Sequence, residues 1–303
     1  MSGSYQSLNL RDPGAVIDAF TRGARANREA ACRRGSIDVA EAPGRLIASG
    51  DLHDNPLHLA RLVGAAGLDG SSDGDADSPA HLTLHEIIHG ELLINGMDFS
   101  YRQLARIAAL KADFPEHVHA LLANHELSHI SGAGIVKDGV RVVDLFNEAV
   151  VSTFGDDAAA VLGAIGGFIR SMPLALRCET GSGCAAILCA HSLPDPALMD
   201  RFDAGVLERE LTEDDYIPRR GAAHLMTWGR AHRPAQLLEL GAAWGVGLFI
   251  LGHERADRGL LVVPPNTVVL NSDHEAGVYL PVDLASPPTP DQAVAQVVPL
   301  AVA

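Results

Sequence analysis

The 303-residue sequence is poor in cysteine and in aromatic side chains. It contains only four cysteines, and aromatic residues make up 5% of the chain. No two cysteines form a C-x-x-C pair, so a zinc knuckle built from thiolates is not expected. Cys178 and Cys184 flank a turn-rich stretch, where a disulfide is disfavoured in a cytoplasmic protein. Any metal site should therefore use nitrogen and oxygen ligands.

Long apolar runs are also missing. No stretch of about 18 apolar residues is free of charges or helix breakers, so we expect neither a membrane span nor a membrane partner. Residues 1–12 are polar and lack the basic and apolar regions of a signal peptide. These absences predict a cytoplasmic location. The 47% of hydrophobic residues is nevertheless enough for a sizeable core.

Positive charge is scarce. The chain has 23 lysines and arginines against 38 acidic residues, for a formal net charge of -15. Nucleic acids are bound mainly through neutralisation of their phosphates, so no nucleic-acid partner is expected. A phosphorylated substrate would need metal ions or local arginines to offset this negative field.

Histidine, in contrast, is abundant. Many of the 14 histidines lie beside acidic residues or asparagine at the ends of apolar runs. Imidazole is suited to transition-metal binding and to proton transfer near neutral pH. The histidines are therefore the main guide to function.

The chain divides by pattern into three parts. Residues 1–43 are predicted to form an N-terminal helical extension, with an amphipathic helix from Pro13 to Ala40. Residues 44–284 alternate short apolar runs with helical patterns, which is typical of an α/β domain. Residues 285–303 form a tail rich in proline and alanine, which we expect to be loosely held.

Five short apolar runs each end in side chains that can bind metal. The runs are predicted strands at residues 45–49, 81–84, 118–123, 184–190 and 247–251. The polar residues that follow them are, in order, Asp51 and His53, Glu86, Asn124 and His125, His191, and His253. The carboxyl ends of strands in α/β sheets line the ligand crevice, so these donors should converge.

The chemistry of this donor set indicates the metal. Mixed histidine, carboxylate and carboxamide ligands suit Mn, Fe or Zn. Two ions roughly 3.5–4 Å apart would bind a substrate phosphate and lower the pKa of a bridging water. One carboxylate must bridge such a pair, and Glu86 is the candidate by its position in the series.

These motifs resemble those of a known superfamily. Asp51-Leu52-His53 with Asn55 resembles the GDxHxN signature of the calcineurin-like phosphoesterases. The segments 123–126, 191–194 and 251–254 resemble the GNHE, HGGLSP and RGHE signatures. Their order and spacing over residues 44–284 are similar to the phosphoprotein phosphatase (PPP)-like branch of the calcineurin-like metallophosphoesterase superfamily.

The resemblance implies a fold and a set of ligands. The fold would be α/β, a two-sheet β-sandwich flanked by helices. Two metal ions would be bound, as in that family. The ligands would be Asp51 and His53 on one ion, Asn124, His191 and His253 on the other, and Glu86 bridging them.

The resemblance also implies a reaction. A metal-bridging hydroxide would hydrolyse a phosphomonoester, as in a serine/threonine phosphatase, with His125 as general acid for the leaving alkoxide and Asp51 also in the catalytic set. A phosphoanhydride is the other bond that relatives cleave. The expected partner is a phosphorylated protein, nucleotide or small metabolite, and the sequence does not predict an oligomeric state.

The second signature of the family departs from its usual form. In place of GDxxDRG the chain has His85-Glu86-Ile87-Ile88-His89-Gly90-Glu91. The bridging aspartate becomes Glu86, the second aspartate becomes His89, and the phosphate-clamping arginine becomes Gly90. Candidate substrate contacts in their place are His89, Arg230 and Arg255. The sequence leaves open whether His85, His89 or His274 also bind metal.

Two other functions fit parts of the sequence. His85, Glu86 and His89 spell the HExxH motif of zinc metallopeptidases, which requires a helix over residues 84–93. Loss of the arginine and of the second aspartate favours a binding protein that keeps the fold with weakened catalysis. We prefer the enzyme, because all the other ligand positions of the family are present.

Overall fold

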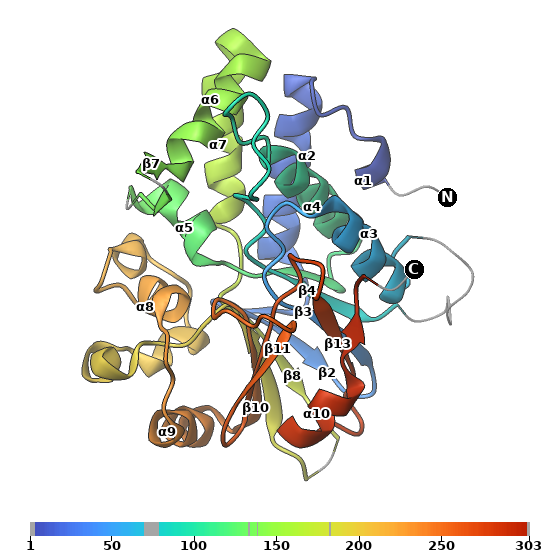
Figure 1. Cartoon of the computed structure of the whole chain (residues 1–303), viewed down its shortest axis with the longest axis vertical. Coiled ribbons are helices and arrows are strands. Elements are labelled where there is room, and N and C mark those ends of the chain that lie inside the picture. The colour runs from blue at the N-terminus through green and yellow to red at the C-terminus, as the bar shows by residue number, and fades with distance from the viewer. Residues whose placement is uncertain (1–3, 70–78, 133, 138, 182, 302–303) are drawn as a thin grey trace.

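The computed structural model describes residues 4–69, 79–132, 134–137, 139–181 and 183–301. In these residues, two mixed β-sheets lie at the centre of the molecule and helices flank them (Figure 1). This is the α/β two-sheet architecture predicted from the sequence, and the prediction is confirmed. A small hairpin of β6 (Val136–Lys137) and β7 (Val140–Arg141) lies apart from the two sheets.

The first sheet has the order β1-β2-β8-β9-β10-β12-β11. The pairs β2–β8, β9–β10 and β10–β12 are parallel, and the other neighbours are antiparallel. The strands are β1 (Arg33–Arg34), β2 (Ile37–Glu41), β8 (Ala175–Glu179), β9 (Ala186–Ala190), β10 (Val246–Leu251), β12 (Thr267–Leu270) and β11 (Leu260–Val263).

The second sheet has the order β14-β13-β3-β4-β5. Strands β3, β4 and β5 are parallel to one another, and β13 is antiparallel to both β3 and β14. The strands are β14 (Val298–Pro299), β13 (Val278–Asp283), β3 (Arg45–Ser49), β4 (His81–Leu84) and β5 (Val118–Ala120).

One hydrophobic cluster joins the two sheets. Leu46 of β3 and Leu280 of β13 belong to the same buried cluster as Ile187 of β9 and Ile250 of β10. Burial of such side chains contributes roughly 1.5–3 kcal/mol each relative to exposure. The packing brings the carboxyl ends of parallel strands from both sheets to one edge.

Helices cover the sandwich. In Figure 1, α1, α2, α4, α6 and α7 gather above the sheets, whereas α8 and α9 lie beside them. Helix α2 packs against α4 and α7, and Asp12 caps its first turn by accepting a hydrogen bond from the Gly14 amide at 2.9 Å. The helices are α1 (Ser4–Ser7), α2 (Pro13–Glu29), α3 (Pro56–Ala65), α4 (Tyr101–Asp113), α5 (Asn124–Ser131), α6 (Val142–Phe154), α7 (Ala158–Ile169), α8 (Ala222–Trp228), α9 (Pro234–Trp244) and α10 (Pro290–Gln296).

Two sequence-based expectations at the ends of the chain are wrong. The predicted helix from Pro13 to Ala40 ends at Glu29, because residues 37–41 pair in parallel with β8 as strand β2. The tail is not loosely held. It forms α10 and then β14, which pairs with β13, and Leu300 is buried. In both cases pairing with a distant strand outweighs local composition.

Helices α6 and α7 form the most apolar helical segment. By length and composition alone, Val142–Ile169 could cross a membrane. The 3-10 turn Gly155–Asp157 divides it, however, and α7 packs on α2, where the rings of Phe168 and Phe20 are 5.8 Å apart. Core helices of soluble proteins meet the same criterion, so this is weak evidence for a membrane span.

A buried ion network joins β2 of the first sheet to β5 of the second sheet and to α4. Asp38 is fully buried and lies 2.8 Å from His119 Nδ1, 3.6 Å from Lys111 Nζ and 3.5 Å from Arg33 Nη1. Burial alone would raise the pKa of Asp38, but the His119 hydrogen bond and the two cations outweigh it and lower the pKa to about 2. Cys32 could complete a metal-binding group with Asp38 and His119. Burial raises the pKa of its thiol to about 12, and the cations already neutralise Asp38, so we interpret the network as structural.

Replacing Lys111 by methionine should destabilise the fold by about 3 kcal/mol, because it removes a buried partner of the Asp38 carboxylate. Urea unfolding followed by circular dichroism measures this change in the free energy of unfolding. The matched control is Arg25→Met. Arg25 and its partner Glu29 are both exposed, so loss of this ion pair should cost at most about 1 kcal/mol. Equal unfolding midpoints for the two variants would contradict the prediction.

Candidate metal centre

The predicted ligands meet at the edge where the two sheets come together. Asp51 follows β3, Glu86 follows β4, Asn124 follows β5, and His191 and His253 follow β9 and β10. Isolated bridges join Asp51 to His85, which follows the neighbouring strand β4, and to Asn271, which follows β12 of the other sheet. Local sequence placed each side chain at a strand end, and the sandwich brings these ends together.

Three side-chain atoms that carry lone pairs lie close to one ring nitrogen of His191. Its Nε2 lies 2.9 Å from Asn124 Oδ1, 3.0 Å from Glu86 Oε2 and 3.0 Å from His253 Nδ1. A single N–H can serve only one of these atoms well, so hydrogen bonding does not account for the arrangement. Lone-pair atoms that face one point are able to hold a metal ion, and their N/O chemistry suits Mn, Fe or Zn.

Glu86 faces a second group of histidines with its other oxygen. Oε1 lies 3.1 Å from His125 Nε2 and 3.6 Å from His53 Nε2. The ligand atoms of His53, Glu86 and His125 form one compact group, and those of Glu86, His191 and His253 form another. Glu86 is therefore shared between two groups that could each hold an ion, as a bridging carboxylate must be.

Asp51 lies on the His191 side of the centre. Its Oδ1 is 3.3 Å from His85 Nδ1 and 3.4 Å from His191 Nδ1, and both of its oxygens accept the backbone N–H of His253. Among the described residues, its compact group is with His85 and His191, whereas His53 groups with Glu86 and His125. This differs from the implied pairing of Asp51 with His53 and brings in His85, which the sequence left open.

The electrostatics of the centre suit cation binding. Burial alone would raise the pKa of Asp51, but hydrogen bonds from His191 and His85 outweigh it and hold the pKa well below its usual range. Burial lowers the pKa of His191 to about 4, and burial with the nearby His191 and Arg230 lowers that of His253 well below its usual value. At neutral pH the carboxylate is ionised and the imidazoles are neutral, which are the forms that bind metal.

The backbone of the centre is strained. Five residues there have positive φ: His53 at 40°, Asp54 at 54°, Glu86 at 46°, His89 at 62° and His253 at 66°. Side chains other than glycine rarely adopt this conformation, which costs of order 1–3 kcal/mol per residue. Such strain persists only where the surrounding structure imposes it, and it is typical of functional sites.

Glu126 is one of the groups that impose this conformation, and our sequence analysis did not identify its role. Its buried carboxylate accepts hydrogen bonds from the amides of Ile87 at 2.8 Å and Ile88 at 3.3 Å. Burial raises the pKa of Glu126 to about 7. Glu126 lies two residues after Asn124, so α5 both supplies a ligand and holds the loop that carries Glu86.

His89 belongs to a buried network behind His125. Its Nδ1 lies 2.5 Å from Asp98 Oδ2, its Nε2 lies 3.0 Å from His129 Nε2, and its ring centroid is 5.2 Å from that of His125. His89 is 2% exposed and is not among the residues that line the pocket described below. Asp98, which sequence reasoning missed, lies nine residues later and could be found only from tertiary contacts.

The peptidase alternative is wrong in its geometry. It requires a helix over residues 84–93, but His85 lies in an isolated bridge after β4, and residues 86–93 are irregular. His85 faces Asp51 and His191, whereas His89 faces Asp98 and His129. The two histidines therefore do not share a ligand position on one helical face.

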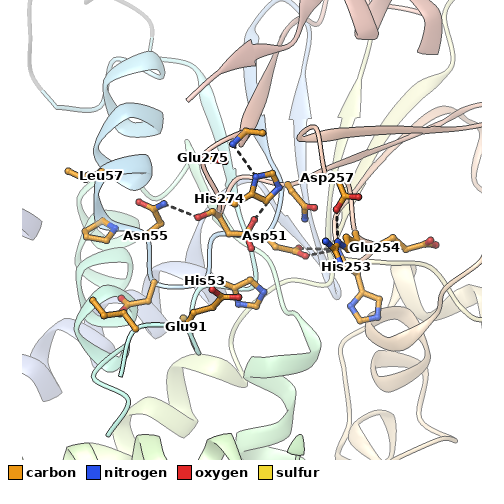
Figure 2. A pocket seen from close by; sticks show the side chains of 18 of the residues that line it. Asp51, His53, Asn55, Leu57, Glu91, His253, Glu254, Asp257, His274 and Glu275 are labelled. Carbon is orange, nitrogen blue, oxygen red and sulfur yellow. Dashed lines mark hydrogen bonds and ion pairs between the residues drawn. The ribbon is translucent and has the colours of Figure 1, made fainter. Parts of the chain in front are cut away.

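A pocket of about 980 Å³ opens over the centre (Figure 2). Arg230 and Arg255 both lie in its wall, where Arg230 donates to the His253 carbonyl at 2.6 Å and the exposed Arg255 pairs with Asp257. His274 also lies in the wall, but its ring nitrogens contact the Ala256 carbonyl and the Ala276 amide. It belongs to none of the compact metal-binding groups of the described residues.

Two residues of the pocket wall, Gly90 and Asn55, have clear structural roles. Gly90, at the position of the family's arginine, leaves no room for a side chain, because a Cβ there would lie 2.6 Å from the His53 carbonyl oxygen. Asn55 caps α3 by accepting from the His58 amide at 3.0 Å and donates to the Asp273 carbonyl at 3.0 Å. Asn55 is therefore the N-cap of α3.

Solved structures of similar shape include protein phosphatases. A protein serine/threonine phosphatase from Saccharomyces cerevisiae with similarity to human phosphatase PP5 has 13% identity and a TM-score of 0.65, over 96% of this chain and 94% of that one. A cold-active protein-tyrosine phosphatase from a psychrophilic Shewanella has 16% identity and a TM-score of 0.52, over 81% and 77% of the two chains. No protein-family model and no curated protein matches the sequence. The likenesses show that this chain shares its α/β two-sheet fold with these phosphatases, as the motif resemblance implies.

Proposed function

We propose that this chain is a metal-dependent phosphatase that hydrolyses a phosphomonoester at a two-ion centre. The observation that carries the proposal is the position of Glu86, whose two oxygens face two separate groups of ligand atoms. The phosphatase names of structures with the same fold support the reaction class. The ions are expected to be Mn, Fe or Zn, and the location cytoplasmic, as the sequence predicts.

The residues of the centre divide into ligands and groups that act on the substrate. Asn124, His191 and His253 would hold one ion and His53 the other, with Glu86 bridging them. The motif resemblance assigns Asp51 to the ion of His53, although the structure groups Asp51 with His85 and His191. When bound, such ions polarise phosphoryl oxygens and lower the pKa of a coordinated water. The chain must then position the ester and supply a proton to its leaving group.

His125 is the residue placed to supply that proton. Its Nε2 lies 3.1 Å from Glu86 Oε1, so the ring is at the centre itself. The buried His89–Asp98 pair lies beside it, where the family has an aspartate. We propose that this pair positions His125 rather than contacting substrate, because His89 is buried away from the pocket. Arg230 and Arg255 in the pocket wall remain the proposed contacts for phosphate.

The charge of the pocket indicates the type of ester. Besides Asp51, six carboxylates line it, against the two arginines: Asp54, Glu91, Glu254, Asp257, Asp273 and Glu275. Walls of this sign repel a substrate that carries several phosphates. We therefore favour a phosphomonoester whose remaining part is neutral or cationic over a phosphoanhydride.

Metal removal and restoration test the proposal. Chelation with EDTA should abolish hydrolysis of p-nitrophenyl phosphate, and added Mn²⁺ should restore it. Elemental analysis of the active protein should find two ions per chain. The control is the same assay after mock dialysis without chelator. Metal-loaded protein that hydrolyses no phosphoester would contradict the proposal and favour a binding protein of this fold.

A further inference from the structure

Two exposed leucines lie at the pocket of the metal centre. Leu92 is 81% exposed and Leu57 is 73% exposed, which makes them the two most exposed large hydrophobic side chains of the described residues. Both line the pocket over the centre. A single exposed leucine is ordinary on a protein surface. Two at one pocket call for a reason, because each leaves in water an apolar surface that burial would stabilise.

Leu57 does not belong to the face by which α3 packs on the protein. It lies in the first turn of that helix, which Asn55 caps. Figure 2 shows Leu57 across the pocket from His253 and Glu254. The buried side chains of α3 are His58, Leu59, Leu62 and Val63. The core therefore gives no reason for a leucine at position 57.

Leu92 begins an exposed apolar run that continues with Leu93 and Ile94. Three consecutive exposed apolar residues are unfavourable on a protein surface unless they have a function. The run starts close to the centre. Gly90, two residues before Leu92, packs on the His53 backbone, since a Cβ there would lie 2.6 Å from the His53 carbonyl oxygen. Two residues span at most about 7 Å, so Leu92 cannot lie far from that contact.

The walls of the pocket suit the two ends of a phosphomonoester differently. Arg230 and Arg255 carry the positive charge that a phosphoryl group requires. Leu57 and Leu92 offer neither charge nor a side-chain hydrogen bond, so their side chains can contact only apolar atoms favourably. The carboxylates of the wall disfavour further negative charge on the organic part of the ester. The organic part that fits is therefore apolar where it meets the leucines and is not anionic.

We propose that Leu57 and Leu92 form an apolar rim that binds an alkyl or aryl group attached to the ester oxygen of the substrate. The inference rests on the proposed phosphomonoester substrate and adds the chemical class of its organic part. Binding would remove from water the apolar surface of both the rim and the ligand. Full burial of one methylene corresponds to about fourfold in affinity, and contact on one side of it to about twofold.

Alkylphosphonates test the rim without turnover, because a carbon replaces the ester oxygen and no ester bond is left to hydrolyse. Calorimetric titration of ethyl-, butyl- and hexylphosphonate into protein loaded with Mn²⁺ measures the dissociation constant for each chain length. We expect this constant to fall about twofold per methylene, or about 16-fold from ethyl to hexyl. The heat capacity change of binding should become more negative with chain length, as burial of apolar surface requires.

The test variant combines Leu57→Gln with Leu92→Gln, which keeps side chains of similar length and removes their apolar surface. Both positions are exposed, so the variant should fold normally, and thermal unfolding checks this. We expect its dissociation constants to be the same for all three chain lengths. The matched control is Leu238→Gln, an exposed leucine of α9 that does not line the pocket. It should keep the 16-fold dependence of the wild type.

The outcomes separate the rim from the proposed reaction. Equal chain-length dependence in the double variant and the wild type would overturn the inference. So would wild-type protein that binds all three phosphonates equally or binds none of them. Chain-length-dependent binding by a protein that hydrolyses no phosphoester would refute the proposed reaction and support the rim. Turnover of p-nitrophenyl phosphate without any dependence of binding on chain length would refute the rim alone.

Discussion

Replacing Asp51 by asparagine is expected to remove at least one metal ion and to lower kcat/KM by at least about 10³-fold, or about 4 kcal/mol. Asp51 is 5% exposed, and both of its oxygens accept the His253 amide. The substitution keeps the shape but removes the charge, and it places an NH₂ donor against that amide or against His85 and His191. Elemental analysis and steady-state kinetics on p-nitrophenyl phosphate measure the two effects.

The control for this prediction is the neighbouring carboxylate. Asp54 lines the pocket but belongs to no compact metal-binding group among the described residues. Burial and the charge of Asp98 raise its pKa to about 7. Asp54→Asn should therefore retain both ions. Unchanged metal content and turnover in Asp51→Asn would refute the assignment of Asp51 to the centre.

Replacing His125 by asparagine should lower kcat by about 10²–10⁴-fold while both ions stay bound, because we propose that its ring donates a proton to the leaving group, although it lies in the same compact group as His53 and Glu86. The loss should be larger for an alkyl phosphate such as phosphoserine than for p-nitrophenyl phosphate. A nitrophenolate needs little protonation on departure, whereas an alkoxide needs a proton from an acid.

The comparison of two leaving groups makes the prediction about His125 specific. The matched control is His274, a histidine of the pocket wall. Its ring nitrogens hydrogen-bond to backbone atoms of residues 256 and 276, and Nε2 lies 3.9 Å from the Asp273 carboxylate, outside the compact metal-binding groups of the described residues. His274→Asn should change neither the metal content nor the leaving-group dependence. Equal losses on both substrates, or release of an ion from His125→Asn, would show that His125 is not the general acid.

The strand-end ligands could be predicted from the sequence because their signal is local. A short apolar run followed by Asp51, Asn124 or His253 predicts a polar side chain at the end of a buried strand, whatever its neighbours are. Several such ends in a familiar order imply one edge of one fold. The pattern predicted that these residues meet, whereas the two-sheet α/β architecture was predicted from the resemblance of the motifs to a known superfamily.

The remaining features depend on contacts between residues that are far apart in the chain. His85 and His191 are separated by 106 positions, and no local pattern shows that their Nδ1 atoms lie 3.2 Å apart. The support of the Glu86 loop by Glu126 and the pairing of His89 with Asp98 likewise arise only when the loops pack together. The predicted helix included residues 37–40, yet residues 37–41 pair with β8.

The sequence alone therefore determined which residue types stand at the ends of the strands, since hydrophobic periodicity and turn chemistry are properties of neighbouring residues. The tertiary structure decided how those residues are arranged. It grouped Asp51 with His85 and His191, excluded a side chain at Gly90, and placed the oxygens of Glu86 between two histidine groups. The physical reason is that the positions of buried polar groups depend on which distant partners satisfy their hydrogen bonds.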